Sequence, residues 1–325
     1  MPFRAPWWLP ERHSQTIWTA LAAPRPSVDY RRERWDTPDG DFIDVDHVDQ
    51  PLDAPVDRRP RLLVFHGLEG DSRSPYALHL MAAARERGWR GSVAHFRGCS
   101  GEPNRLARAY HSGDSDEIDW IVRRLRLRMS AGGEQGPLLA CGISLGGNAL
   151  LKWLGERGDE AGRLVEAAAG VSAPQDLAAG ADALARGFSR LYTRNFLRTL
   201  IGKSLAKLDA HPGLYDATRV RAARTFHEFD DLVTAPLHGF ADCHDYWRRS
   251  SCKQYLGGVR VPTLVVNALN DPFVPARVLA RPDEVAPAVT LDYPSGGGHV
   301  GFAAGPMPGR FDWLPARVLG FLDRR

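Results

Sequence analysis

The sequence predicts an α/β fold, in which a mostly parallel sheet is covered by helices on both faces. Short apolar runs alternate along the chain with longer segments of helical spacing, the pattern of a sheet built from strand–helix units. One run, Pro137–Ile143, shows no apolar–polar alternation, as expected for a strand buried on both faces. At 325 residues, the chain suits one large domain with an insertion.

Composition and charge exclude several classes of protein. The net charge of +3 is too small to indicate a nucleic-acid partner, and no run of 18 apolar residues could form an integral membrane segment. The N-terminal residues lack the apolar core of a secretory signal, and the four cysteines show no C-x-x-C spacing. We therefore expect a cytoplasmic enzyme that acts on a small molecule, and its oligomeric state is left open.

The first 60 residues predict a leader and a hairpin. The leader, residues 1–25, is rich in tryptophan and predicts a short helix around Gln15–Leu21 that packs onto the domain surface, with a membrane-interface anchor as the alternative. Residues 28–48 contain two strand-like stretches around the turn signal Pro38–Gly40, which predicts an antiparallel hairpin at one sheet edge. Residues 51–60 are rich in proline and predict a loop.

The remaining core elements follow from apolar runs and helix boundary signals. Strands are expected at Leu62–Phe65, Ser92–Phe96, Leu164–Val171, Val261–Asn267 and Val289–Tyr293. Helices are expected at Pro75–Gly88, Asp116–Met129, Ala149–Leu154 and Asp312–Leu322. The loop over residues 97–114 is too long for a simple connector, so it either lines the site or forms a self-contained Ω-loop.

The pattern changes between Pro174 and Gly258, where apolar residues recur at helical spacing over a length that exceeds a simple crossover. We expect residues 1–173 and 259–325 to form the core, and residues 174–258 to form a helical cap inserted into it. An apolar stripe in this segment either packs wholly on the core or leaves a slot for an acyl chain. Its residues are Phe188, Leu191, Tyr192, Leu197, Leu200 and Ile201.

A nucleophile is predicted where the strand Pro137–Ile143 ends. The pentapeptide Gly142–Gly146 has the form G-x-S-x-G, and helix formers follow it directly. Strand, sharp turn and helix are the context in which this motif forms a nucleophile elbow, with the serine hydroxyl standing clear of the sheet. The alternative is a chance glycine-rich turn. We expect Ser144 to be the nucleophile.

A base and an acid follow later strands. The order Ser144, Asp271, His299 is the order in which α/β-hydrolases supply their triad, and each residue lies just past the end of an expected strand. Imidazole can take the serine proton near neutral pH, and a carboxylate fixes the imidazole tautomer. Asp176 is the rival acid; the strand-then-Asp-Pro context favours Asp271.

The loop after Leu62–Phe65 predicts an oxyanion hole. In α/β-hydrolases this loop donates a backbone N–H to the substrate oxyanion, so we expect Leu68 N–H and Leu145 N–H to be the donors. The alternative for this His-Gly segment is an ordinary strand-end turn. The residues expected to contact the substrate are His66, Gly67 and His111.

Seven segments together resemble the YheT-type α/β-hydrolases, a group with bacterial predicted esterases, eukaryotic abhydrolase-domain lipases and yeast medium-chain ester synthases. They are Pro6–Leu9, His66–Gly70, Arg97–Arg105, Tyr110–Gly113, Glu228–Asp230, His238–Phe240 and Asp271–Phe273. The resemblance covers nearly the whole chain. It implies the same triad of Ser144, Asp271 and His299.

We therefore expect a serine ester hydrolase, a carboxylesterase that cleaves short- to medium-chain acyl esters through an acyl-enzyme. No cofactor is expected. No metal is expected either, because the spacing of His238, Asp242 and His244 matches no strong ligand pattern. The alternatives are an acyltransferase or ester synthase with the same triad, a lipase or phospholipase, and a non-catalytic binding protein of this fold.

Overall fold

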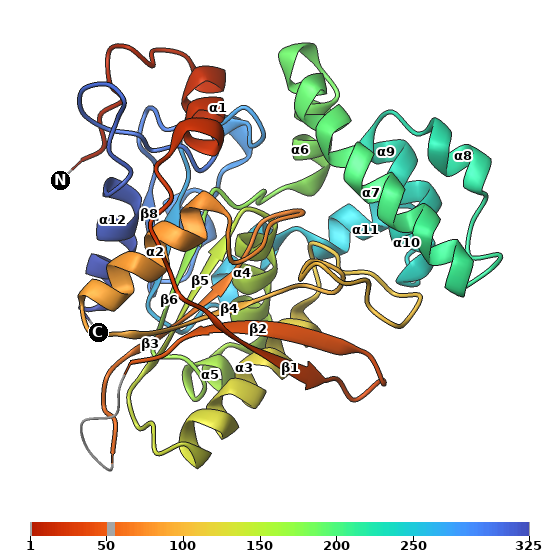
Figure 1. Cartoon of the computed structure of the whole chain (residues 1–325). Coiled ribbons are helices and arrows are strands. Elements are labelled where there is room, and N and C mark those ends of the chain that lie inside the picture. The colour runs from red at the N-terminus through yellow and green to blue at the C-terminus, as the bar shows by residue number, and fades with distance from the viewer. Residues whose placement is uncertain (1, 51–55, 325) are drawn as a thin grey trace.

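The computed structural model describes residues 2–50 and 56–324, and its centre is an eight-stranded sheet (Figure 1). The strand order is β1-β2-β4-β3-β5-β6-β7-β8. The strands are β1 (Arg31–Asp36), β2 (Phe42–Val48), β3 (Arg61–Phe65), β4 (Arg90–Ala94), β5 (Leu138–Ile143), β6 (Ala167–Val171), β7 (Thr263–Val266) and β8 (Val289–Asp292). β2 pairs antiparallel with β1 and β4, and all other neighbours pair parallel. The predicted α/β fold and its edge hairpin are confirmed.

Helices cover both faces of the sheet, as Figure 1 shows. Outside the segment between β6 and β7, the α-helices are α1 (Arg12–Ala22), α2 (Pro75–Glu86), α3 (Ser115–Ala131), α4 (Leu145–Arg157), α5 (Asp159–Gly162) and α12 (Trp313–Leu322). Alternate residues of β3 enter opposite cores: Leu63 and Phe65 pack with α3 and α4, whereas Leu62 and Val64 pack with α2 and α12. The central strands are apolar without alternation because both faces are buried.

The segment between β6 and β7 is helical and lies to one side of the sheet, in green and cyan in Figure 1. Its α-helices are α6 (Leu177–Leu184), α7 (Arg190–Ala210), α8 (Ala217–Ala222), α9 (Phe226–Phe229), α10 (Ala235–Leu237) and α11 (Cys243–Ser250). A short π-helix, η2 (Asp230–Thr234), and the 3₁₀ helices η1 (Gly187–Ser189) and η3 (Cys252–Gly258) complete it. Two apolar clusters of its own hold these helices together. The cap boundaries at residues 174 and 258 stay a prediction.

Several expected strand boundaries differ from those in the structure, and contacts explain two of the differences. β4 begins at Arg90 rather than at Ser92, because Arg90 is buried with its guanidinium 2.5 Å from the Asp57 carboxylate. β6 begins at Ala167 rather than at Leu164, because Leu164 belongs to the preceding turn, where its N–H donates to the Ala161 carbonyl (2.9 Å). The 3₁₀ helices η4 (Ala276–Val278) and η5 (Pro282–Glu284) lie between β7 and β8. Residues 51–55 of the expected loop lie outside the described residues.

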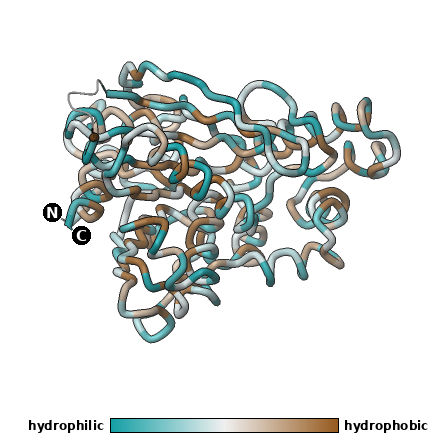
Figure 2. Tube along the Cα trace, turned by 90° about the horizontal axis from the view of Figure 1, so that it is seen from below, coloured by the Kyte–Doolittle hydropathy of each residue, from teal (hydrophilic) through white to brown (hydrophobic). Residues whose placement is uncertain are grey.

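Hydrophobic and hydrophilic residues are interspersed along the whole trace (Figure 2). Within residues 2–50 and 56–324, no helix combines the length and the apolar character that crossing a bilayer requires.

Candidate active site

Ser144 occupies a strained turn between β5 and α4, with φ 52° and ψ −117°. The two glycines of the pentapeptide lie where the backbone passes itself closely. A Cβ on Gly142 would lie 2.3 Å from the carbonyl oxygen of Gly146, and one on Gly146 would lie 2.5 Å from that of His66. This turn therefore requires glycine at both positions. Backbone strain of this kind is typical of a nucleophile elbow.

The serine is linked to a histidine and an aspartate. His299 Nε2 lies 2.9 Å from Ser144 Oγ, and His299 Nδ1 lies 2.8 Å from Asp271 Oδ2. The other carboxylate oxygen of Asp271 accepts backbone hydrogen bonds from Phe273 (2.7 Å) and Val274 (3.2 Å). The Phe273 ring stacks on the imidazole, with 4.2 Å between ring centroids. These contacts fix the carboxylate and the imidazole plane.

Asp176 performs a different task in the structure. Its carboxylate caps the N-terminus of α6 by accepting a hydrogen bond from Ala179 N (3.0 Å). The geometry therefore favours Asp271 over Asp176 as the partner of His299.

A cavity of about 790 Å³ lies over Ser144 and His299. Leu68 and Leu145 line it as well. Leu145 is the first residue of α4, and the first N–H groups of a helix have no acceptor within the helix. Two backbone segments that the sequence predicts as oxyanion donors thus border the same space as the serine.

The turn Gly67–Gly70 sets the direction of the Leu68 backbone. Its first carbonyl accepts a hydrogen bond from its last N–H (3.0 Å), and Glu69 has φ 56°, which defines a type II turn. Side chains hold Glu69 in this unfavourable conformation: Tyr110 Oη donates to its carboxylate (2.8 Å), and Lys203 of α7 forms an ion pair with it (2.9 Å). The roles of Tyr110 and Lys203 could not be predicted from the sequence, because their contacts with Glu69 join distant segments of the chain.

His66 and Gly67 do not line the cavity. His66 is fully buried; its Nδ1 donates to the Gly67 carbonyl (2.7 Å), and its Nε2 accepts from Phe96 N (3.0 Å). Burial lowers the pKa of His66 to about 3, so the ring is neutral. Both ring nitrogens are occupied within the fold. The expectation that His66 contacts the substrate therefore requires correction. Gly67 lies beside the nucleophile, since a Cβ on it would be 3.2 Å from Ser144 Cβ, and its contact with the substrate stays a prediction.

His111 does line the cavity. Its Nδ1 accepts from Gly113 N (3.2 Å), and its ring lies 4.4 Å from that of His238, measured between centroids. Burial lowers the pKa of His111 below its ordinary value. A neutral imidazole with one nitrogen bound to the backbone is suited to a polar contact in this cavity.

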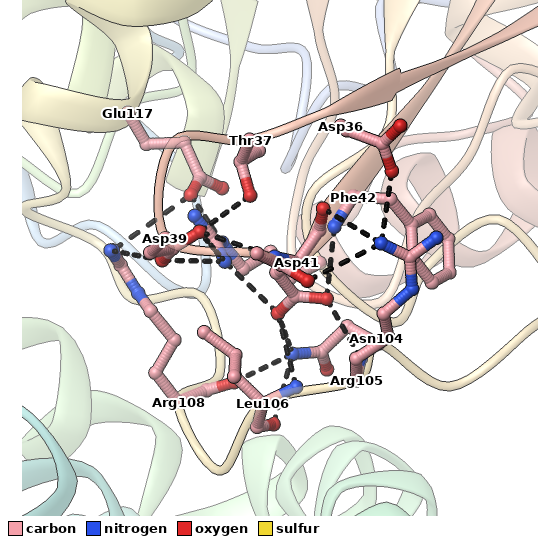
Figure 3. Close-up of polar contacts among 12 residues, drawn as sticks. Asp36, Thr37, Asp39, Asp41, Phe42, Asn104, Arg105, Leu106, Arg108 and Glu117 are labelled. Atoms are coloured by element: carbon pink, nitrogen blue, oxygen red, sulfur yellow. Dashed lines mark hydrogen bonds and ion pairs between the residues drawn. The ribbon is translucent and has the colours of Figure 1, made fainter.

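A buried network holds the loop at residues 97–105 (Figure 3), and residues 97–99 and 101–104 of this loop line the cavity. Asp41 at its centre has no solvent exposure and accepts hydrogen bonds from Asn104 Nδ2 (2.6 Å), Arg97 (2.9 Å) and Arg105 N (2.7 Å). Burial raises the pKa of Asp41, but the hydrogen bonds from Asn104, Arg105 and Arg97 lower it by more. The pKa thus lies below its ordinary value, and the loop is tied to a permanent carboxylate.

We expect Asp41→Ala to destabilise the fold by roughly 3–5 kcal/mol, because Arg97, Asn104 and the backbone N–H of Arg105 all lose a buried acceptor. Thermal denaturation should show a fall in Tm of several degrees. Because the folded-state pKa of Asp41 is lowered, its contribution is fully present above the ordinary aspartate pKa and is lost as the pH falls below that value. Asp36→Ala is the control, since Asp36 is exposed and its ion pair with Arg105 should contribute little. Equal Tm values for the two variants would contradict this role.

Apolar side chains of the helical segment form much of the cavity wall. They are Leu177, Leu184, Phe196, Phe226, Phe229, Val233 and Leu237. Of the apolar stripe predicted from the sequence, Leu200 lines the cavity, Leu197 is buried within the helical segment, and Phe188 and Leu191 are exposed. The stripe is therefore divided between packing, cavity and surface. Among the described residues, no group of three His, Cys, Asp or Glu side chains is arranged to hold a metal ion.

Comparison with known proteins places this chain in a family. A family model described as the alpha/beta hydrolase fold matches residues 60–306. YheT of Escherichia coli (strain K12), whose name proposes an esterase, is 42% identical over 292 residues, which are 89% of this chain and 84% of that protein. Phospholipase ABHD3 of Mus musculus is 31% identical over 311 residues, 93% of this chain and 73% of that protein.

Solved structures agree on the fold. An esterase of Pyrococcus furiosus, PF2001, superposes with a TM-score of 0.58 over 91% of each chain, at 14% identity. The esterase EaEST of Exiguobacterium antarcticum gives a TM-score of 0.55 over 90% of this chain and 100% of that one, also at 14% identity. The fold, the elbow and the family model together define an α/β-hydrolase. Within that class the chain belongs to the YheT-type family, as its identity to the Escherichia coli protein shows.

Proposed function

We propose that this protein is a serine carboxylic ester hydrolase. The observation that carries the proposal is the hydrogen-bonded series Ser144–His299–Asp271, with contacts of 2.9 and 2.8 Å, at the floor of a cavity. A serine hydroxyl next to an imidazole that is itself held by a carboxylate is the arrangement that activates serine for acyl transfer. The esterase and phospholipase names of the relatives are consistent with ester chemistry.

The first half of the reaction forms an acyl-enzyme. Ser144 Oγ attacks the ester carbonyl while His299 Nε2 takes its proton, and Asp271 stabilises the resulting imidazolium. The N–H groups of Leu68 and Leu145 donate to the oxyanion of the tetrahedral intermediate. The C–O bond to the alcohol then breaks, and His299 returns the proton to the departing alkoxide.

The second half regenerates the serine. Water attacks the acyl carbonyl and gives its proton to His299, and the second tetrahedral intermediate collapses with Ser144 as the leaving group. The carboxylic acid is released. Every proton passes through His299, so the reaction needs neither metal nor cofactor.

The cavity is suited to an apolar acyl chain. Its volume of about 790 Å³ lies within the range of small-molecule sites, and most of its wall is apolar. We propose short- to medium-chain acyl esters as substrates, with the chain against Phe196, Phe229 and Leu237, which all line the cavity.

We expect kcat/KM for nitrophenyl esters to climb with acyl length and then to fall. Each methylene buried in the cavity should contribute up to ~0.8 kcal/mol, about fourfold in kcat/KM, until the space is full. Initial rates for the series from acetate to palmitate measure this directly. A maximum at acetate would mean that the helical segment excludes the chain. Values still rising at palmitate would indicate a lipase instead.

A further inference from the structure

The helix of the tryptophan-rich leader reaches the loop that carries His299. Figure 1 shows α1, in red, beside the blue C-terminal part of the chain. Two consecutive polar residues of this helix, Gln15 and Thr16, are buried, with exposures of 2% and 8%. Buried polar side chains are nearly always hydrogen-bonded, so the partners of Gln15 and Thr16 indicate what these residues do in the structure.

Thr16 binds the backbone of the histidine itself. Its Oγ1 donates to the carbonyl of Arg12 (2.8 Å) and accepts from His299 N (2.9 Å). The single hydroxyl proton of Thr16 is donated to the Arg12 carbonyl, so the Thr16 oxygen acts as the acceptor for the His299 N–H. This single atom therefore fixes the start of the His299 side chain relative to α1.

Gln15 ties together the two loops that meet at the imidazole. Its Oε1 accepts from Gly297 N (2.8 Å) and from Asn270 Nδ2 (3.0 Å), and its Nε2 donates to the Leu9 carbonyl (2.8 Å). Asn270 Oδ1 in turn accepts from Gly298 N (3.0 Å). Asn270 directly precedes Asp271, and Gly297 lies two positions before His299. The side-chain amide of Gln15 therefore binds both the Asp271 loop and the His299 loop.

Helix α1 and the loop that carries His299 are packed in close contact. A Cβ on Gly298 would lie 2.6 Å from Thr16 Oγ1, and one on Gly301 would lie 2.7 Å from the Gln15 carbonyl oxygen. The glycines around His299 therefore allow the loop to approach α1 closely, and Gly298 also allows the positive φ of the backbone at that position. A further hydrogen bond joins Thr19 Oγ1 to the Gly301 carbonyl (3.0 Å).

The leader is itself fixed to the rest of the fold. Trp8 Nε1 donates to the Gly305 carbonyl (3.0 Å), and Trp18 Nε1 donates to the Pro308 carbonyl (2.8 Å). Leu9 is buried in an apolar cluster with Ala303 and other residues of the C-terminal part. The tryptophans thus hold α1 against the loop, which gives the aromatic leader a role other than surface packing.

We propose that Gln15 and Thr16 are positioning residues for His299, and that the N-terminal leader is an integral part of the catalytic site. This inference rests on the proposed function, since it assigns a task to His299 as the proton carrier. Thr16 and Gln15 touch neither the serine nor the cavity; they act through the backbone on either side of the imidazole.

The first test compares Thr16→Val, Thr16→Ser and Ser14→Ala. Valine keeps the shape of threonine and loses the acceptor, so we expect kcat for a nitrophenyl ester to fall about 10- to 100-fold with little change in KM, because small misplacement of a reacting group costs up to about 10²-fold. Thr16→Ser retains the hydroxyl and should restore kcat to within about threefold of the wild type. Ser14→Ala is the matched control, since the Ser14 hydroxyl binds only Glu11 O within the same helix turn among the described residues.

A second variant, Gln15→Met, separates a loss of positioning from a folding defect. Gln15→Met has a similar length and removes both loop contacts, so it should lower kcat in the same way while thermal denaturation still shows a cooperative transition. The rate of Ser144 labelling by a fluorophosphonate should fall in parallel, since it needs the same base. If Thr16→Val and Gln15→Met match Ser14→Ala in kcat, the inference is wrong while the proposed function stands. A wild-type protein that neither hydrolyses esters nor reacts with the fluorophosphonate would overturn both.

Discussion

Replacing Ser144 by alanine is expected to lower ester turnover by about 10⁶-fold, the size of effect that follows removal of a triad nucleophile. The reaction loses the atom that forms the acyl-enzyme, and only binding and the oxyanion donors remain. Alanine keeps the Cβ and so tolerates the positive φ no better and no worse than serine. The variant should therefore fold with a Tm close to that of the wild type.

Burst and steady-state kinetics with a nitrophenyl ester measure this effect, with circular dichroism and Tm as the check on folding. A variant that retains more than about a tenth of the wild-type turnover would show that hydrolysis does not pass through Ser144.

Asp271→Asn is expected to lower turnover by about 10⁴-fold through the imidazole tautomer. One carboxylate oxygen of Asp271 accepts two backbone hydrogen bonds, so the asparagine carbonyl should take that place. Its NH₂ group then faces His299 Nδ1, where the second oxygen lies now. A donor at that position makes Nδ1 the acceptor and puts the proton on Nε2, which can then no longer take the proton of Ser144.

Asp176→Asn is the matched control for this substitution. Asp176 caps α6, and asparagine is an equally good N-cap, so turnover and stability should stay within about twofold of the wild type. The reverse pattern, with Asp176→Asn inactive and Asp271→Asn active, would move the acid to the loop after β6.

Much of the site could be predicted from local patterns. Ser144 was identifiable because the elbow is a contiguous motif. Its two glycines are required, since a Cβ on Gly142 or on Gly146 would lie 2.3 or 2.5 Å from a backbone carbonyl oxygen. Asp271 and His299 were identifiable because they follow the strands β7 and β8 in a sheet whose carboxyl ends meet at one edge. The structure brings all three within hydrogen-bond distance.

Other features depend on contacts that no local pattern encodes. His66 lies at a strand end, like a site residue, yet complete burial and two backbone partners remove it from the cavity. Thr16 and His299 are 283 positions apart in the sequence, and their contact exists only because the leader packs on the C-terminal loops. Arg90 is the first residue of β4 although it is charged, because its guanidinium forms a buried ion pair with the Asp57 carboxylate.

The sequence also could not predict which apolar residues of the helical segment line the cavity and which pack inside the segment. Helical spacing identifies an apolar face, but it does not say what that face meets. Leu200 and Leu197 share the same periodic stripe, yet one borders the cavity and the other is buried in a cluster of the segment itself. The acyl-length profile therefore tests a property that only the three-dimensional arrangement defines.

The most direct test of the account is to locate the covalent adduct after treatment with a fluorophosphonate. The hydroxyl of Ser144, 2.9 Å from its base, is expected to react alone, so mass spectrometry of the intact protein should show one adduct and peptide mapping should place it on Ser144. Ser144→Ala should then remain unmodified. An adduct on another serine, or labelling of Ser144→Ala at the wild-type rate, would contradict the assignment of Ser144 as the nucleophile.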